Sequence, residues 1–78
     1  MPTVLNQGGY LFFFYAGDRG EPPHIHMERE GRIAKFWLEP ARLASSGGFR
    51  HGEINAVERI VVAERERFME AWNDFSGD

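Results

Sequence analysis

Two stretches of β-prone residues, His24–Arg29 and Arg32–Glu39, flank the dipeptide Glu30-Gly31, and this arrangement predicts a β-hairpin with a two-residue turn. Prolines stand before the first stretch and after the second, outside both predicted strands, because proline cannot donate a hydrogen bond to a sheet. A two-residue turn fixes the register of the hairpin. A shift of one residue would move every side chain to the opposite face.

The predicted register divides the side chains of the hairpin between two faces. On one face Arg29 lies opposite Arg32, Met27 opposite Ala34, and Ile25 opposite Phe36; on the other Glu28 lies opposite Ile33, His26 opposite Lys35, and His24 opposite Trp37. The first face is apolar toward the strand ends. The second gathers two histidines, a glutamate, a lysine and a tryptophan, and is therefore the candidate functional face.

The rest of the chain predicts further strands and a long helix. Apolar residues recur at intervals of three and four from Ile54 to Phe75, which is typical of an amphipathic helix whose apolar stripe needs a sheet to cover it. We expect a strand at 3–5, a turn at 6–9, a strand at 10–15 covered on both faces, a loop at 16–23, a helical turn at 40–46 and a helix at 53–75. The expected fold class is α+β: an antiparallel meander of three or four strands packed on one long C-terminal helix.

The length and composition of the chain exclude several classes of protein. The 78 residues fit a single domain, 1–78, and the absence of cysteine excludes disulfides and thiolate metal sites. A net charge of -3 argues against broad, non-specific binding of nucleic acid. The longest apolar run, Leu11–Ala16, is far shorter than the roughly 20 residues of a membrane span. With no signal peptide at the N-terminus, we expect a cytoplasmic protein that does not enter membranes.

His24, His26 and Glu28 alternate along one predicted strand, so their side chains share a face at steps of about 6.6–7 Å. Two imidazoles at this spacing, with a carboxylate nearby, are able to bind a divalent metal ion. They also suit a general base and a general acid, since imidazole titrates near neutral pH. A third interpretation is a surface strand whose histidines hydrogen-bond to neighbouring groups.

Lys35 and Trp37 lie across from these histidines in the predicted hairpin. Lys35 is the sole lysine of the chain and interrupts an otherwise apolar strand. A cation beside an aromatic ring is able to hold a phosphate and stack a nucleic-acid base. The alternative is that Trp37 belongs to the core and Lys35 extends its stem toward water.

Several segments resemble a small bacterial family of domains of unknown function. They are the run from Gly9 to Tyr15, the Glu-Pro-Pro-His-Ile-His block at 21–26, the Ala-Lys-Phe-Trp-Leu-Glu-Pro block at 34–40, and the helix end at 70–75. Members of that family read EPPHVHV and AKFWLEP in the corresponding blocks. The resemblance extends over nearly the whole chain. Arg19-Gly20 departs from it, because members carry an acidic residue and a histidine there.

The resemblance implies a toxin-like component of a toxin-antitoxin module, with a second small protein encoded nearby as its partner. It also implies that His24, His26, Lys35 and Trp37 are important, without giving their roles. The leading hypothesis is this toxin-like role; if the protein is an enzyme, we expect a ribonuclease-like hydrolase acting on RNA, in which His24 and His26 are base and acid and Lys35 contacts phosphate. Trp37 and Glu28 would then serve as binding residues on the same face.

Two alternatives stay open. One is a non-catalytic protein-binding module, an antitoxin or an adaptor, that binds its partner or a second copy of itself through the helix or a sheet edge. The other is a small metal-binding protein that uses His24 and His26 as ligands. Only in that case is a cofactor, a divalent metal ion, expected. Whether the chain is an enzyme is a question that these residues alone do not decide.

Overall fold

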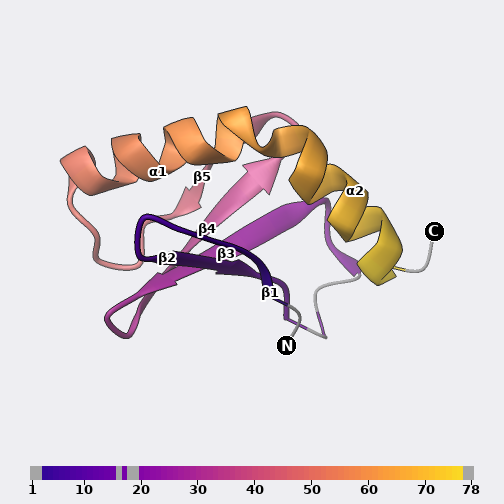
Figure 1. Cartoon of the computed structure of the whole chain (residues 1–78), viewed down its shortest axis with the longest axis horizontal. Helices are drawn as coiled ribbons and strands as arrows, with labels where there is room; N and C mark the ends of the chain where they lie inside the picture. Colours follow the sequence, from indigo (N-terminus) through magenta and orange to yellow (C-terminus); the bar gives the residue numbers. More distant parts are fainter. Residues whose placement is uncertain (1–2, 16, 18–19, 77–78) are drawn as a thin grey trace.

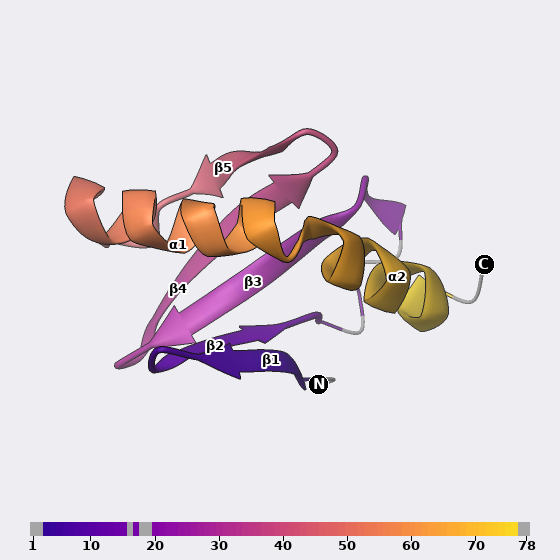
Figure 2. The same cartoon turned by 45° about the horizontal axis from the view of Figure 1, so that its top comes forward.

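The computed structural model describes residues 3–15, 17 and 20–76, and in this part of the chain five strands form one antiparallel sheet covered on one face by two helices (Figure 1). The elements are β1 (Thr3–Gln7), β2 (Tyr10–Phe13), β3 (His24–Arg29), β4 (Arg32–Leu38), β5 (Ala41–Ser45), α1 (His51–Ala63) and α2 (Arg65–Ser76). The strands lie in chain order, so the sheet is a simple meander. Figure 2 shows both helices on the same side of the sheet. The α+β class is therefore confirmed.

The hairpin of β3 and β4 has the predicted turn and the predicted register. All six cross-strand pairs are present, from His24 opposite Trp37 to Arg29 opposite Arg32. Glu30 and Gly31 both adopt positive φ, 52° and 80°, as a tight two-residue turn that matches the twist of the strands requires. The side chains of the hairpin consequently divide between the two faces of the sheet as predicted.

The apolar face of the hairpin meets the helices and forms the centre of the core. Its side chains Ile25, Met27, Ala34 and Phe36 are fully buried. They pack in one cluster with apolar residues of both helices, including Ile54, Val57, Val61, Phe68 and Trp72. This aromatic-rich layer stabilises a chain too short for a large core, since each buried aromatic ring removes a large apolar area from water.

Strand β2 is buried on both faces, as its unbroken apolar sequence predicts, although the strand itself ends at Phe13. The Phe12 ring packs on Phe68 of α2, with 5.1 Å between ring centroids. Phe13 lies on the opposite face, where its ring stacks on His26 at 5.6 Å. The same strand thus supports the core on one side and the histidine-bearing face on the other.

The prediction of a helical turn at 40–46 is wrong, because this segment forms β5, which brings the number of strands above the expected three or four. Leu43 lies opposite Phe36 and Arg42 opposite Trp37. Pro40 lies in the turn between β4 and β5 instead of beginning a helix. So short a segment cannot nucleate a stable helix by itself, whereas pairing with β4 satisfies its backbone hydrogen bonds.

The prediction of one long helix at 53–75 is also wrong: the helical region begins at His51 and is interrupted at Glu64. A straight helix over residues 51–76 would measure about 39 Å, more than the longest dimension of the molecule, 34 Å. At the interruption the Arg65 Nε donates a hydrogen bond to the carbonyl oxygen of Leu38, 2.6 Å away, and ties α2 to the end of β4. Neither α1 nor α2, the helices of the described residues, has the length and hydrophobicity to cross a membrane.

The structure gives the bounds of the two loops predicted at 6–9 and 16–23. Strand β1 continues through Gln7, so the turn expected at 6–9 consists of Gly8 and Gly9 alone, both at positive φ. The loop expected at 16–23 ends where predicted, since β3 begins at His24. Residues 16, 18 and 19 of that loop, including the Arg19 that departs from the family pattern, lie outside the described residues.

Gly47 and Gly48 join β5 to α1, and the structure makes unequal demands on them. Both have positive φ, but a β-carbon at Gly47 would collide with the Ile33 carbonyl of β4, whereas one at Gly48 would meet nothing within 4 Å. We expect Gly48→Ala to lower the free energy of unfolding by about 1–2 kcal/mol through left-handed backbone strain. Gly47→Ala should lower the free energy of unfolding by about 1–3 kcal/mol more than Gly48→Ala does, because of the overlap with the Ile33 carbonyl. Urea unfolding of both variants measures this difference, and equal losses would contradict the close approach of Gly47 to β4.

Candidate functional site

The sheet face turned away from α1 and α2, called here the open face, carries the residues predicted to be functional. The ring centroids of His24 and His26 are 5.2 Å apart, and those of His24 and Trp37 are 5.7 Å apart. The Lys35 Nζ lies 4.5 Å from the centre of the Trp37 ring. Because Lys35 also lies directly opposite His26 in the register, the four side chains form one cluster.

His24 is the buried member of the cluster, with no exposed surface. Its ring contacts that of Trp37 and, although it belongs to the open face, also that of Trp72 in α2, whose ring centroid is 4.9 Å away. The His24 Nδ1 donates a hydrogen bond of 2.8 Å to the carbonyl oxygen of Pro22, which fixes the proton on that nitrogen, since a carbonyl can only accept. A group enclosed in this way positions its neighbours and does not itself touch a ligand on the surface.

His26 is the imidazole nearer to solvent, because its side chain is only partly buried. It is framed by aromatic rings: Phe13 stacks on one side and Tyr15 approaches at 4.5 Å between centroids. Tyr15 is itself 39% exposed. The open face therefore presents an imidazole beside a phenol ring, and the ammonium group of Lys35 beside the indole ring of Trp37.

Glu21 supplies the carboxylate of the site; it belongs to the 21–26 block, but the sequence predicted no role for it. Its Oε1 accepts a hydrogen bond of 2.6 Å from Lys35 Nζ and lies 4.0 Å from the His24 Nδ1. The Glu21 side chain is 48% exposed and that of Lys35 is 23% exposed. Ion pairs this open to water contribute about 0–1 kcal/mol, so an anionic ligand is able to displace the carboxylate from Lys35.

Glu28, the carboxylate that was predicted, lies on the open face opposite Ile33, one step beyond His26 toward the hairpin turn. Trp37 is at the other end of the face. The signal that favours Glu21 lies in the sequence block itself, in which Glu21 immediately precedes Pro22 and Pro23. Two prolines hold the backbone extended, and the segment leads from Glu21 directly to the buried His24.

A metal ion held by His24 and His26 would need further ligands, since protein zinc sites have at least three. Within residues 3–15, 17 and 20–76, no group of three or more His, Cys, Asp or Glu side chains is arranged to hold an ion. His51, the remaining histidine, is exposed at the start of α1.

Comparison with known proteins gives a family but no characterised relative. A family model described as Domain of unknown function (DUF4160) matches residues 9–73. That span includes the whole β3–β4 hairpin, Glu21 and the Trp72 that covers His24. No curated protein and no solved structure matches the chain.

The burial of His24 predicts a mainly structural cost when it is removed. We expect His24→Ala to lower the free energy of unfolding by about 2–4 kcal/mol, because a cavity opens beside Trp72 and the bond to Pro22 is lost. His51→Ala, at an exposed position, is the matched control and should change stability by about 0.5 kcal/mol or less. Urea unfolding followed by tryptophan fluorescence measures both variants, and similar stabilities would contradict the enclosed position of His24.

Proposed function

The chain belongs to the family of domains of unknown function DUF4160, and we propose that its open face is a ribonuclease-like site that cleaves single-stranded RNA. One observation carries the proposal. The Lys35 Nζ lies 2.6 Å from the Glu21 carboxylate and 4.5 Å from the centre of the Trp37 ring, and Lys35 is paired with His26 in the register of the hairpin. A carboxylate, an imidazole and a cation are thus gathered on one partly exposed patch.

The aromatic rings of the patch suit a single-stranded nucleic acid. Tyr15 and Trp37 are partly exposed on the open face, beside His26. Unpaired bases stack on such rings, each contributing about 1–3 kcal/mol. The adjacent ammonium group of Lys35 then contacts the phosphate that joins two stacked bases. Sheet surfaces with exposed aromatic residues are a common solution for binding unpaired RNA.

The titratable groups suit the cleavage of RNA, because its 2′-hydroxyl is a nucleophile within the substrate. Glu21, as general base, takes the 2′-hydroxyl proton, and the oxygen forms a bond to the adjacent phosphorus. Protonated His26, as general acid, gives its proton to the 5′-oxygen as the bond from phosphorus to that oxygen breaks. The products are a 2′,3′-cyclic phosphate and a free 5′-hydroxyl. Lys35 stabilises the negative charge that develops on the phosphoryl oxygens.

In this scheme the two histidines have different roles. His26 is the partly exposed group and touches the substrate. His24 is a positioning residue, because its buried ring contacts the rings of both His26 and Trp37. Trp37 forms a stacking wall. Glu21, and not His24 as the sequence suggested, is the general base, because the enclosed imidazole of His24 cannot reach a hydroxyl group of a bound strand.

We further propose that this activity makes the chain a toxin-like component of a toxin-antitoxin module. The support is the resemblance of the 21–26 and 34–40 blocks to a family whose members resemble such components. Those two blocks supply Glu21, His26, Lys35 and Trp37. The segments that carry the resemblance are therefore the ones that build the proposed site.

The proposal predicts cleavage of an unstructured RNA oligonucleotide by the purified protein, with a 2′,3′-cyclic phosphate product detected by mass spectrometry. His26→Ala and Glu21→Gln should each reduce the rate by about 10²–10⁴, the usual contribution of a general acid or base. His51→Ala and Glu30→Gln are matched controls at exposed positions outside the site and should keep the wild-type rate. The same oligonucleotide with 2′-deoxy sugars should remain intact.

Expression in a bacterial host without the partner tests the toxin-like role. Wild-type protein and His51→Ala should arrest growth and degrade cellular RNA, whereas His26→Ala should do neither. Intact RNA and normal growth with the wild-type protein would overturn the proposal. Cleavage that is equally fast in His26→Ala would show that the activity does not come from this site.

A further inference from the structure

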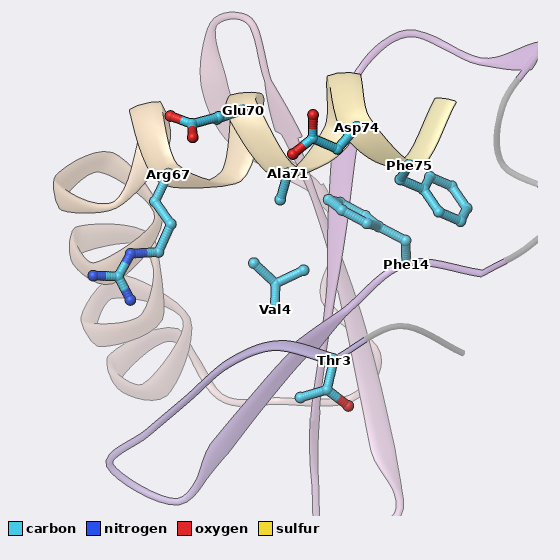
Figure 3. A pocket seen from close by; sticks show the side chains of 8 residues that line it. All are labelled: Thr3, Val4, Phe14, Arg67, Glu70, Ala71, Asp74 and Phe75. Atoms are coloured by element: carbon cyan, nitrogen blue, oxygen red, sulfur yellow. The ribbon is translucent and has the colours of Figure 1, made fainter. Parts of the chain in front are cut away.

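A groove of about 710 Å³ lies between β1 and α2, at the edge of the sheet (Figure 3). Its apolar lining comes from Val4 of β1, Phe14 after β2, and Ala71 and Phe75 of α2. Phe14 and Phe75 stack on each other with 5.1 Å between ring centroids. The groove is therefore a preformed apolar slot beside an edge strand, and it shares no lining residue with the Glu21–His26–Lys35 site.

Strand β1 offers hydrogen bonds along one side of this groove. It is the outer strand of the sheet formed by the described residues and pairs there only with β2. Edge strands are usually protected by charged residues or proline, because their free backbone groups attract further strands. Thr3–Gln7 contains neither, although its pairing with β2 shifts register between Thr3 and Leu5. An extended segment is thus able to add to β1 and direct alternate side chains toward the groove.

The α2 side of the groove carries two carboxylates at positions where negative charge destabilises the helix. Glu70 and Asp74 both line it, four residues apart on the same helix face, and like charges at this spacing destabilise a helix by about 0.2–0.5 kcal/mol. Asp74 lies near the C-terminal end of α2, where cations are favoured, and the last turn holds no basic residue. Arg67, the remaining charged residue of the lining, binds Glu64 with its Nε at 3.1 Å. A cation brought by a ligand would relieve this acidic rim.

We propose that the groove binds an extended segment of a different protein, which pairs with β1, inserts an apolar side chain against Phe75, and places a lysine or arginine two residues away beside Glu70 and Asp74. The two side chains share a face because strand residues alternate, at a spacing of about 6.6–7 Å. A second copy of this chain fits poorly. Its own β1, Thr3–Gln7, has no basic residue to meet the acidic rim, and its other edge strand, β5, offers Arg42 with only the small Ala44 two positions further along the strand.

This inference does not rest on the proposed ribonuclease function. The groove is lined by β1 and by α2, which covers the opposite side of the sheet from the open face. A partner segment in the groove and a nucleic acid on the open face would therefore occupy different surfaces.

Selection of displayed short peptides on the intact protein tests the inference. We expect enrichment of extended sequences in which an apolar residue is followed, two positions later, by lysine or arginine. A selected peptide with a fluorescent label should then bind at least about tenfold more weakly to Glu70→Lys, a loss of about 1.4 kcal/mol. Glu66→Lys is the matched control, since Glu66 is an exposed glutamate of α2 outside the groove. It should bind the peptide like the wild type.

Exchanging the charges of the peptide and of Glu70 shows that a loss of binding does not come from misfolding of the variant. The selected peptide with its basic residue changed to glutamate should bind poorly to the wild-type protein and recover affinity for Glu70→Lys. His26→Ala should bind the original peptide normally, which separates this site from the ribonuclease site. No enriched pattern, equal binding to Glu70→Lys and Glu66→Lys, or a dimer in light scattering that occupies the groove would each overturn the proposal.

Discussion

The pairing of β3 with β4 is the constraint on which the rest of the molecule depends, because the same two strands build the core and the candidate site. Ile25 and Phe36 turn toward the helices, and His26 and Lys35 turn to the open face. A shift of one residue would bury Lys35 in the core and expose Phe36. Burial of an unpaired charge costs several kcal/mol, so the core enforces the register that also assembles the site.

The C-terminal helix completes the site from the other side of the sheet. Its interruption at Glu64, with the bond from Arg65 to the Leu38 carbonyl, lets α2 turn along the end of the sheet. That turn brings Trp72 against both Phe14 and His24, with centroid distances of 5.3 and 4.9 Å. The buried His24 in turn contacts His26 and Trp37. The arrangement of the open face therefore depends on packing in the core.

The parts of the structure that could be predicted from the sequence are those set by local rules. The hairpin register follows from a two-residue turn and a period of two, both visible in 24–37. Strand β5 could not be predicted in this way, because Ala41, Leu43 and Ala44 favour helix intrinsically and only pairing with β4 makes the segment extended. The helix interruption falls where Glu64 and Arg65 stand in place of apolar residues between Val61 and Phe68, but the contact of Arg65 with Leu38 at that point is a tertiary one that spacing does not predict.

The predicted site residues are brought together for the same local reason, and the additional ones depend on long-range contacts. Glu21 reaches Lys35 because the segment before β3 returns alongside the end of β4, where the Leu38 amide donates to the Pro23 carbonyl at 3.0 Å. The enclosure of His24 depends on Trp72, far away in the sequence. Neither contact leaves a periodic signal, so alternation predicted the face of each histidine but not its exposure.

The charge of the molecule sets the kind of RNA contact that the proposed site is able to make. With a net charge of -3, and with Lys35 paired with Glu21, the open face offers modest electrostatic attraction to a long polyanion, to which the exposed Arg42 opposite Trp37 adds. Each phosphate contact makes the logarithm of the binding constant fall with the logarithm of the salt concentration, with a slope of about 0.7 for a single strand. Most of the affinity must then come from bases stacking on Tyr15 and Trp37. A site of this kind selects short, unpaired and flexible RNA, because only unstacked bases can reach the rings while the phosphate between them meets Lys35.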